Sequence, residues 1–259
     1  MKIAVIMGTC RKTGAGAGYL LQLQQVLVGA DVEWDTIWLG DCNLRLCLGC
    51  KVCYERGEEA CPLRDGYLEA MARLNGADAA VFYSPTFTVS VTGLLKTFFD
   101  RSSYVLHRPY FKGRRALVLT SADSWGEATA LQTLRQIVSL MGFSVVAGLG
   151  VVNLRYECNA GYRRRVDRRL RRMSERLLAQ ATGGKLVRPT LMELIVFQYQ
   201  KTAFGAAQGS CSNDRQFWRD AGWTRADAAY YCPARVSTVR GWLARGAVRL
   251  VRGAPWLTR

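Results

Sequence analysis

Residues 79–83 read Ala79-Ala80-Val81-Phe82-Tyr83, five apolar residues in a row without polar alternation. Such a run is typical of a strand covered on both faces of a parallel sheet. Similar runs rich in Val, Ile, Tyr and Phe recur at Lys2–Met7, Val32–Leu39, Ala116–Thr120 and Phe143–Val152. The segments between them have helical spacing and predict helices near Gly16–Gly29, Gly66–Leu74, Val91–Tyr104, Glu127–Met141 and Gly161–Ala181. Five strands alternating with helices predict an α/β fold with a doubly wound, five-stranded parallel sheet.

The alternating pattern stops at Thr182-Gly183-Gly184, where the composition shifts to amphipathic segments that carry Arg and Trp. We therefore expect a sheet domain over residues 1–183 and a C-terminal helical extension over residues 184–259. The sequence contains no apolar run long enough to span a membrane, and it begins with a strand-like segment instead of a signal peptide. These features predict a cytoplasmic protein, peripheral to a membrane at most.

The chain is strongly basic, with 36 Lys and Arg against 20 Asp and Glu and a formal net charge of +16. Much of the charge lies in the arginine-rich segment 163–172. A charge of this size favours anionic partners, which include phosphorylated cofactors, acidic lipid headgroups and nucleic acid. The segment 163–172 lies on a predicted helix, where arginines are typical of a solvated face, so we do not expect nucleic acid to be a partner.

A glycine-rich loop, Gly8-Thr9-Cys10-Arg11-Lys12-Thr13-Gly14, follows the first predicted strand and leads into a helix. Glycines let backbone N–H groups approach a phosphate, and the helix N-terminus adds a positive dipole. Thr9, Arg11 and Lys12 can add hydroxyl and cationic contacts. The loop matches neither the P-loop nor the dinucleotide fingerprint, because no Lys-Ser/Thr follows Gly14 and the third glycine is missing. It predicts a phosphate site of another kind, and the alternative is a glycine-rich turn without a ligand.

A second loop, Ser84-Pro85-Thr86-Phe87-Thr88-Val89-Ser90-Val91-Thr92-Gly93-Leu94-Leu95-Lys96, follows the central apolar run, and the next helix ends in Asp100-Arg101. This stretch resembles the NADPH-dependent FMN reductase branch of the flavodoxin-like superfamily, where a strand ends in Ser-Pro-x-Tyr and continues through Ser-x-Thr-Gly-x-Leu-Lys to Asp-Arg. The glycine-rich loop resembles the phosphate loop Gly-Ser-x-Arg-x-x-Gly of the same family. The similarity covers about residues 1–180, with its motifs at the strand ends, where doubly wound folds bind ligands.

The resemblance implies a flavodoxin-like fold, FMN as cofactor, NAD(P)H as electron donor and a homo-oligomeric protein. It assigns to the FMN phosphate the residues Thr9, Arg11, Lys12 and Gly14, and it places beside the isoalloxazine ring the residues Ser84, Pro85, Thr86 and Phe87. A third loop, which starts at Ser121 and includes Trp125, can close over the ring; the alternative for Trp125 is a packing role. The sequence departs from the family pattern where Ala15 and Gly16 replace Asn and Thr, and where Val89 replaces a glycine. We therefore expect weaker FMN binding than is usual in the family.

Four of the nine cysteines lie close together, in Cys47-Leu48-Gly49-Cys50-Lys51-Val52-Cys53 and, seven residues later, at Cys61. Two-residue spacers let three sulfurs converge on one cluster face, and a fourth cysteine can close the remaining corner. The spacing also resembles the compact motif of iron-sulfur flavoproteins, which belong to the same superfamily. We predict a four-iron four-sulfur (4Fe–4S) cluster on Cys47, Cys50, Cys53 and Cys61; a structural zinc tetrahedron and unliganded or redox-active thiols are the alternatives. We expect the remaining cysteines to be buried packing residues: Cys10, Cys42, Cys158, Cys211 and Cys232.

The tail beyond residue 235 mixes valines, leucines and Trp242 with arginines at helical spacing, which predicts a basic amphipathic helix. Such a helix can lie on an anionic membrane, or it can pack on its own domain or on a dimer partner. His107 is the sole histidine of the chain, so sites built from several histidines are excluded.

Two hypotheses follow. The first is an FMN-dependent oxidoreductase that moves electrons from NAD(P)H or a reduced carrier protein to an acceptor through the cluster. The second is a non-enzymatic electron carrier or redox-responsive binding protein that docks on a membrane or an acidic partner through its basic tail. Turnover of NAD(P)H by the purified protein distinguishes the two.

Overall fold

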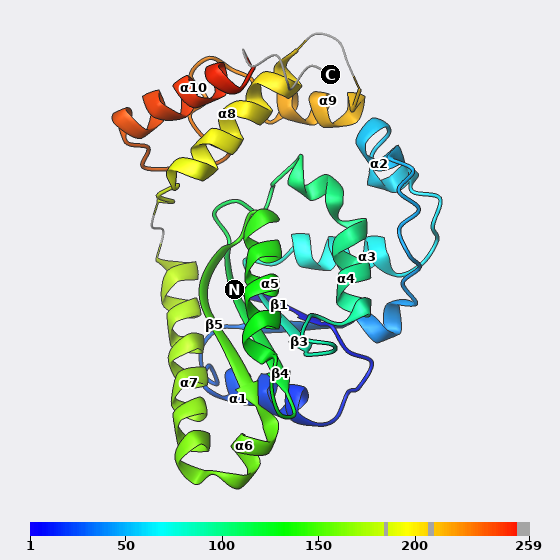
Figure 1. Cartoon of the computed structure of the whole chain (residues 1–259), viewed down its shortest axis with the longest axis vertical. Coiled ribbons are helices and arrows are strands. Elements are labelled where there is room, and N and C mark those ends of the chain that lie inside the picture. Colours follow the sequence, from blue (N-terminus) through cyan, green and yellow to red (C-terminus); the bar gives the residue numbers. More distant parts are fainter. Residues whose placement is uncertain (184–185, 207–209, 253–259) are drawn as a thin grey trace. The chain divides into compact units, whose positions relative to one another are not determined.

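A computed structural model of the chain describes residues 1–183, 186–206 and 210–252 (Figure 1). Residues 251 and 252 are described by their backbone alone. The chain divides into two compact units. Unit 1 comprises Met1–Cys50, Pro62–Ser103 and Arg114–Gly184, and unit 2 comprises Lys51–Cys61, Tyr104–Gly113 and Lys185–Arg259. The boundary expected between residues 183 and 184 falls beside residues outside the described part of the chain and stays a prediction.

Unit 1 is built on a five-stranded sheet in which every pair of neighbouring strands is parallel. The strands are β1 (Lys2–Met7), β2 (Glu33–Trp38), β3 (Ala79–Pro85), β4 (Arg115–Ala122) and β5 (Ser144–Val152). Their order is β2-β1-β3-β4-β5, the order of flavodoxin-like folds, which confirms the predicted fold class. The central strands β1, β3 and β4 are buried along almost their whole length, which explains their continuous apolar sequences.

Helices cover both faces of this sheet (Figure 1). One face carries α1 (Ala15–Gln25) and α7 (Ala160–Thr182); the other carries α3 (Tyr67–Asn75), α4 (Gly93–Arg101) and α5 (Glu127–Leu140), with the short helix α6 (Asn153–Cys158) after β5. Leu23 of α1 and Leu170 of α7 share a buried cluster with Val5. On the other face the ring of Phe82 packs against Phe99 and Phe143. The predicted helices are confirmed to within a few residues, apart from the end of Gly16–Gly29 and the separate 3₁₀ turn η3 (Ser103–Leu106).

The C-terminal segment forms helices within unit 2, as the sequence predicts. This segment contributes α8 (Leu191–Gly205), α9 (Ser212–Asp220) and α10 (Thr238–Arg252). Unit 2 also contains α2 (Val52–Glu55) and the 3₁₀ turn η2 (Glu58–Ala60) from the earlier part of the chain. An aromatic cluster around Phe197, Trp218 and Tyr231 forms the core, so the rings of the tail build a small core of their own. Within the described residues, no helix combines the length and apolarity needed to cross a membrane.

A buried ion pair in unit 1 joins the end of α4 to the turn before α3. Arg101 and Asp65 pair through side chains that are 2% and 3% exposed, and the guanidinium lies over the ring of Tyr67. Burial by itself would raise the pKa of Asp65. The backbone N–H groups of Arg45 and Tyr67 and the guanidinium of Arg101 outweigh burial and hold that pKa below its usual value. The arginine of the Asp-Arg motif is therefore a scaffold residue.

We predict that Arg101→Met lowers the free energy of unfolding by about 3–5 kcal/mol, because Asp65 is left buried without its counter-charge. The matched control is Lys96→Met on the same helix, where an exposed pair with Asp100 should be worth less than about 0.5 kcal/mol. Because the pKa of Asp65 is depressed in the folded protein, the charged carboxylate contributes to the free energy of unfolding at pH values above its unfolded pKa. This contribution is lost as the pH falls through the folded pKa. Urea unfolding at pH 7 and pH 3 should show the gap between wild type and Arg101→Met narrowing at pH 3.

Candidate functional site

The pairing of β1 with β3 places the glycine-rich loop next to the loop that follows β3. The N–H of Gly8 donates to the carbonyl oxygen of Tyr83 (2.8 Å), and Thr92 Oγ1 donates to the carbonyl oxygen of Gly8 (2.7 Å). Thr92 also caps α4, accepting from the N–H of Leu95, while its own N–H donates to Ser84 Oγ (3.0 Å). Ser84 and Thr92 therefore lock the two loops together.

Beside this junction lies a pocket of about 190 Å³, entirely within unit 1. It sits at the carboxyl ends of the strands, where the strand order reverses and doubly wound folds bind their ligands. The lining comes from the glycine-rich loop, the start of α1, the ends of β3 and β4 and the start of α6, through Thr9, Arg11, Thr13, Ala15, Gly16, Tyr83, Pro85, Thr86, Phe87, Ser121, Ala122, Asp123 and Asn153.

Most of the residues assigned to FMN by sequence meet in this pocket: Thr9, Arg11, Pro85, Thr86, Phe87 and Ser121. Three are placed differently. Lys12 forms an exposed ion pair with Asp41 (2.7 Å), Gly14 precedes α1 as its N-cap, and Ser84 is buried under the loop. Asp123 and Asn153 also line the pocket and hydrogen-bond each other at 2.9 Å across the ends of β4 and β5. Asp123 belongs to the third loop predicted from sequence, which gave it no role of its own, and Asn153 lay outside every sequence motif.

The end of the pocket at α1 suits a phosphate group. Gly14 has a φ of 108°, which favours glycine, and within the described residues no side chain caps α1. The first N–H groups of the helix are then available to an anion, with the helix dipole favouring negative charge. Arg11 lines the same wall of the pocket. The backbone N–H of Arg11 donates to Thr9 Oγ1 (3.1 Å), and this hydrogen bond fixes the loop.

The opposite end of the pocket offers an apolar edge and an unused polar atom. Thr86 Oγ1 is buried, and no hydrogen-bond partner for it exists among the described residues. Phe87 next to it is 63% exposed. It opens a tight turn closed by hydrogen bonds with Ser90, in which Thr88 and Val89 have positive φ values of 49° and 59°. Both residues are β-branched and strained there, which explains why a glycine suits the position of Val89.

Gly16 departs from the family pattern for a structural reason. The ring of Tyr83 lies over it: a Cβ at Gly16 would come within 2.4 Å of the ring. Tyr83 is itself held in place, because its hydroxyl shares a hydrogen bond with Ser121 Oγ (2.7 Å) and burial raises its pKa. In this arrangement the ring of Tyr83 leaves no room for the threonine that the family has at position 16.

We predict that Gly16→Ala destabilises the protein by about 1–3 kcal/mol, since the added methyl displaces a pinned, buried ring. Gly18→Ala is the control on the same helix: its Cβ meets open space, so alanine should be neutral or stabilise by about 0.5–1 kcal/mol. Thermal unfolding of both variants measures the contrast. Equal melting temperatures for the two would show that Tyr83 moves aside freely.

The cysteine loop passes from unit 1 to unit 2. Cys47 and Cys50 are exposed in unit 1, whereas Cys53 on α2 and Cys61 after η2 are half-buried in unit 2. The cluster on these four residues stays a prediction. Among the other cysteines, Cys10 and Cys158 are exposed and Cys42, Cys211 and Cys232 are half-buried, so the expectation that all five are buried is wrong. Trp125 is also exposed, which rules out a packing role for it within unit 1.

A doubly wound parallel sheet with a glycine-rich loop after its first strand and a pocket at its switch point defines a flavodoxin-like protein. Residues 1–154 match the family described as NADPH-dependent FMN reductase. The chain therefore belongs to this family of flavin-dependent oxidoreductases.

Curated relatives are named iron-sulfur flavoproteins. The chain is 32% identical over 114 residues to one from Archaeoglobus fulgidus, covering 44% of this chain and 51% of the relative. It is 29% identical over 154 residues to one from Clostridioides difficile, covering 58% and 67%. The chain thus spans about half to two thirds of the length of these relatives. Among solved structures, apo NADH:FMN oxidoreductase EMOB superposes with a TM-score of 0.51 at 22% identity, over 67% of this chain and 88% of that one, and supports the fold.

Proposed function

We propose that the protein is an FMN-dependent oxidoreductase that takes electrons from NAD(P)H or a reduced carrier. The observation that carries the proposal is the buried Thr86 Oγ1 in the wall of the strand-end pocket, which has no hydrogen-bond partner in the described part of the chain. An unsatisfied buried hydroxyl costs about 1–3 kcal/mol, and a bound polar group would remove this cost. FMN fits the pocket because its phosphate and its isoalloxazine ring need different surroundings. The N–H groups at the start of α1 suit the phosphate, and the apolar edge at Phe87 suits the ring.

The residues present divide the binding between them. The N–H groups at the start of α1, with Thr9 and Arg11, would hold the phosphate, and Thr86 and Phe87 would border the ring. Bound FMN supplies the chemistry of accepting an electron pair and releasing electrons singly. No protein acid or base of high specificity is needed for this, which accords with a pocket whose lining contains no histidine. The exposed Phe87 leaves one side of the pocket accessible to a donor.

We predict that Thr86→Val has opposite effects on the apoprotein and on FMN binding. Valine removes the unsatisfied hydroxyl, so the apoprotein should be as stable as wild type or up to about 1–3 kcal/mol more stable. FMN affinity, measured by quenching of flavin fluorescence, should fall about tenfold because a hydrogen bond to the ring is lost. NADH and NADPH oxidation by the reconstituted variant should fall at limiting FMN and recover at saturating FMN. Unchanged FMN affinity would remove Thr86 from the site.

We propose further that Cys47, Cys50, Cys53 and Cys61 hold a 4Fe–4S cluster. The donor set supports this: four thiols with two-residue spacers suit a four-iron cluster, and the curated relatives carry iron-sulfur in their names. The backbone also turns sharply on either side of Cys50, where Gly49 and Lys51 have φ values of 64° and 60°, and Cys50 itself is exposed. A cluster passes one electron at a time, and it would make the protein a converter between two-electron and one-electron donors.

Protein purified without oxygen should contain about four iron and four sulfide per chain. Cys50→Ser should remove both, and Cys158→Ser, which changes an exposed cysteine of unit 1, should remove neither. Iron and sulfide analysis with an anaerobic absorption spectrum measures this. One zinc per chain in place of iron that Cys50→Ser removes would support the tetrahedral alternative, and protein from which Cys50→Ser removes no metal would leave these cysteines as thiols.

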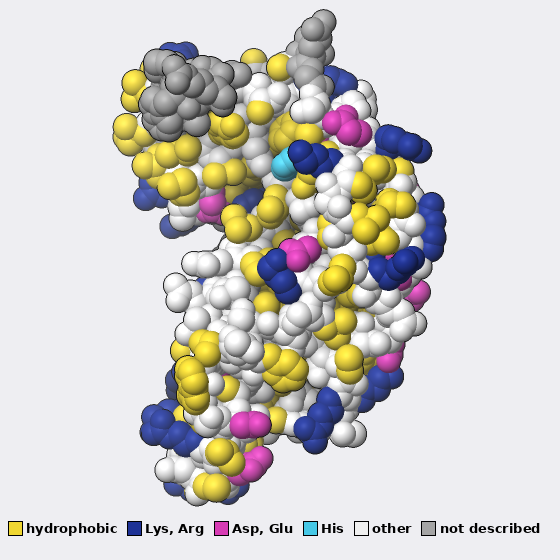
Figure 2. All heavy atoms as spheres, turned by 45° about the vertical axis from the view of Figure 1, so that its right-hand side comes forward, with side chains coloured by type: hydrophobic (Ala, Val, Ile, Leu, Met, Phe, Trp, Pro, Cys, Tyr) yellow, Lys and Arg dark blue, Asp and Glu magenta, His cyan; other side chains and the backbone are white. Residues whose placement is uncertain are grey.

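A second candidate function, docking on an anionic membrane, is favoured by the structure of α10. Ala244 and Val248 face the core of unit 2. At about 100° per residue, the exposed Val239, Trp242 and Leu243 lie on the opposite side of the helix. Exposed arginines flank this outer stripe: Arg240, Arg245 and Arg249. Figure 2 shows hydrophobic and cationic side chains side by side at the upper left, in the region of α8 and α10. A helix apolar on two opposite sides fits both expectations, packing inward and binding lipid outward.

Cosedimentation with vesicles of anionic phospholipid tests this function. Leu243→Ser should weaken binding about tenfold, since burying one leucine contributes about 1.5 kcal/mol. Leu21→Ser is the control, because Leu21 on α1 has nearly the same exposure, 56% against 55%. Binding should also weaken as salt is raised, because the arginines act through screened electrostatics. If neither salt nor Leu243→Ser alters sedimentation, the outer stripe has another role.

A further inference from the structure

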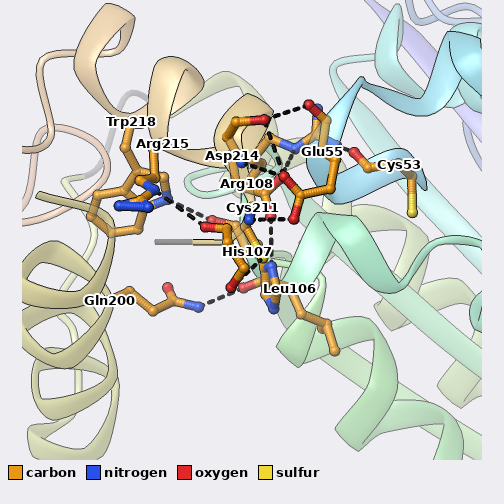
Figure 3. A network of polar contacts seen from close by, with 12 residues as sticks. Cys53, Glu55, Leu106, His107, Arg108, Gln200, Cys211, Asp214, Arg215 and Trp218 are labelled. Carbon is orange, nitrogen blue, oxygen red and sulfur yellow. Dashed lines mark hydrogen bonds and ion pairs between the residues drawn. The ribbon is translucent and has the colours of Figure 1, made fainter. Parts of the chain in front are cut away.

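Unit 2 contains a group of metal-binding side chains that lies apart from the cysteine loop in sequence. His107, Cys211 and Asp214 bring their ligand atoms within 4.8 Å of one another (Figure 3). All three belong to the same unit. Among the described residues, this is the one set of at least three His, Cys, Asp or Glu side chains that meets this distance. We infer that His107, Cys211 and Asp214 form a binding site for one zinc-class divalent cation, with a fourth position for water.

The helix α9 positions two of the ligands. Cys211 is its N-cap and Asp214 lies three residues further on, so both side chains project from the first turn toward the same side. Cys211 has a φ of 64°, an unfavourable backbone conformation for a residue other than glycine. The carboxylate of Glu55 stabilises it, accepting from the N–H groups of Cys211 (2.6 Å) and Ser212 (3.0 Å). Strain maintained in this way by neighbouring groups is characteristic of functional positions.

The third ligand, His107, is also fixed before any metal arrives. Its ring stacks on Tyr54 at a centroid distance of 4.5 Å and lies 5.3 Å from the ring of Phe204. Its Nδ1–H donates to Asp214 Oδ2 (2.6 Å), and its carbonyl oxygen accepts from the indole N–H of Trp218 (2.7 Å). Tyr54 and Phe204 therefore hold the imidazole ring in place beside the carboxylate of Asp214, so the ring needs little further ordering when a metal binds.

The local charge favours a cation. Asp214 is fully buried and its Oδ1 lies 2.8 Å from Arg108 Nε, although without the geometry of a hydrogen bond. Arg108 is already paired with Glu58 (2.7 Å), which leaves the charge of Asp214 only partly compensated. A divalent cation that displaces the thiol proton of Cys211 to solvent meets one thiolate, one carboxylate and one neutral imidazole, so its two charges are balanced.

The donor set selects the metal. Thiolate sulfur, imidazole nitrogen and carboxylate oxygen are the three ligand types that bind zinc, whereas calcium and magnesium require oxygen ligands. Three protein ligands leave one tetrahedral position for water, and His107 is partly exposed, which gives water access. The cation would join the start of α9 to the segment 104–113 and so reinforce unit 2.

Metal content of the purified full-length protein tests the inference. After loading with zinc and dialysis, Cys211→Ser and His107→Asn should each hold one zinc per chain less than wild type. Asparagine can keep the hydrogen bond to Asp214 while removing the imidazole, so this variant retains the fold even if Cys211→Ser does not. Cys158→Ser, at an exposed cysteine of unit 1, is the matched control and should hold as much zinc as wild type.

Cobalt as a probe separates this site from the cysteine loop. In a Cys47→Ser, Cys50→Ser, Cys53→Ser, Cys61→Ser background, one cobalt should still bind with a thiolate charge-transfer band, and Cys211→Ser should abolish the band. Competition with a chromophoric chelator should show affinity reduced by more than about 100-fold in His107→Asn, since loss of an outer partner alone costs about 10- to 100-fold. Equal metal content in wild type, Cys211→Ser and His107→Asn would overturn the inference and identify the group as a hydrogen-bonded histidine–aspartate pair without a metal.

Discussion

The parallel pairing of β1 with β3 is the constraint on which the rest of unit 1 depends. It aligns Met7 with Tyr83, so the loops that follow both strands start at the same level of the sheet. Gly8 and Thr92 then bind the two loops to each other through backbone and hydroxyl hydrogen bonds. Because the chain leaves β1 toward β2 on one side and reaches β3 on the other, this junction is also the point where a pocket must open.

The side chain of Tyr83 at this junction restricts its neighbours. With Tyr83 at the end of β3, the ring occupies the space that a side chain at residue 16 would need, so only glycine fits. The ring is in turn fixed by Ser121 at the end of β4, so α1, β3 and β4 are linked in the pocket wall. The absence of a side chain at position 16 is therefore tied to the aromatic wall that Tyr83 forms, and the phosphate contacts proposed above fall to backbone N–H groups, Thr9 and Arg11.

The sequence predicted what depends on local pattern. Short apolar-rich runs identified the strands, continuous in β1, β3 and β4 and interrupted by Glu33 and Asp35 in β2, and helical spacing identified the helices that cover the sheet. Both signals are carried by neighbouring residues. The sequence pattern did not predict contacts between residues that are far apart in the chain. Lys12 was assigned to the phosphate, but Asp41, far along the chain, folds close enough to bind it. Thr88 and Val89 are β-branched and favour extended backbone, yet the turn between Phe87 and Ser90 forces both into the left-handed region.

Unit 2 shows why the tail could not be understood from its own sequence. Its core is aromatic, but the polar groups that fix α9 come from segments more than a hundred residues earlier: Glu55 caps the helix, and Arg108 pairs with Asp214. Arg108 also donates to the carbonyl oxygen of Cys53 (2.9 Å), so this cysteine is held by the same network that orders His107 and Asp214. Cys53 therefore has a fixed backbone before any metal binds, whereas Cys47 and Cys50 lie in an exposed segment. The position of Cys53 is thus set by a contact between segments far apart in the sequence, which the local spacing of the cysteines cannot reveal.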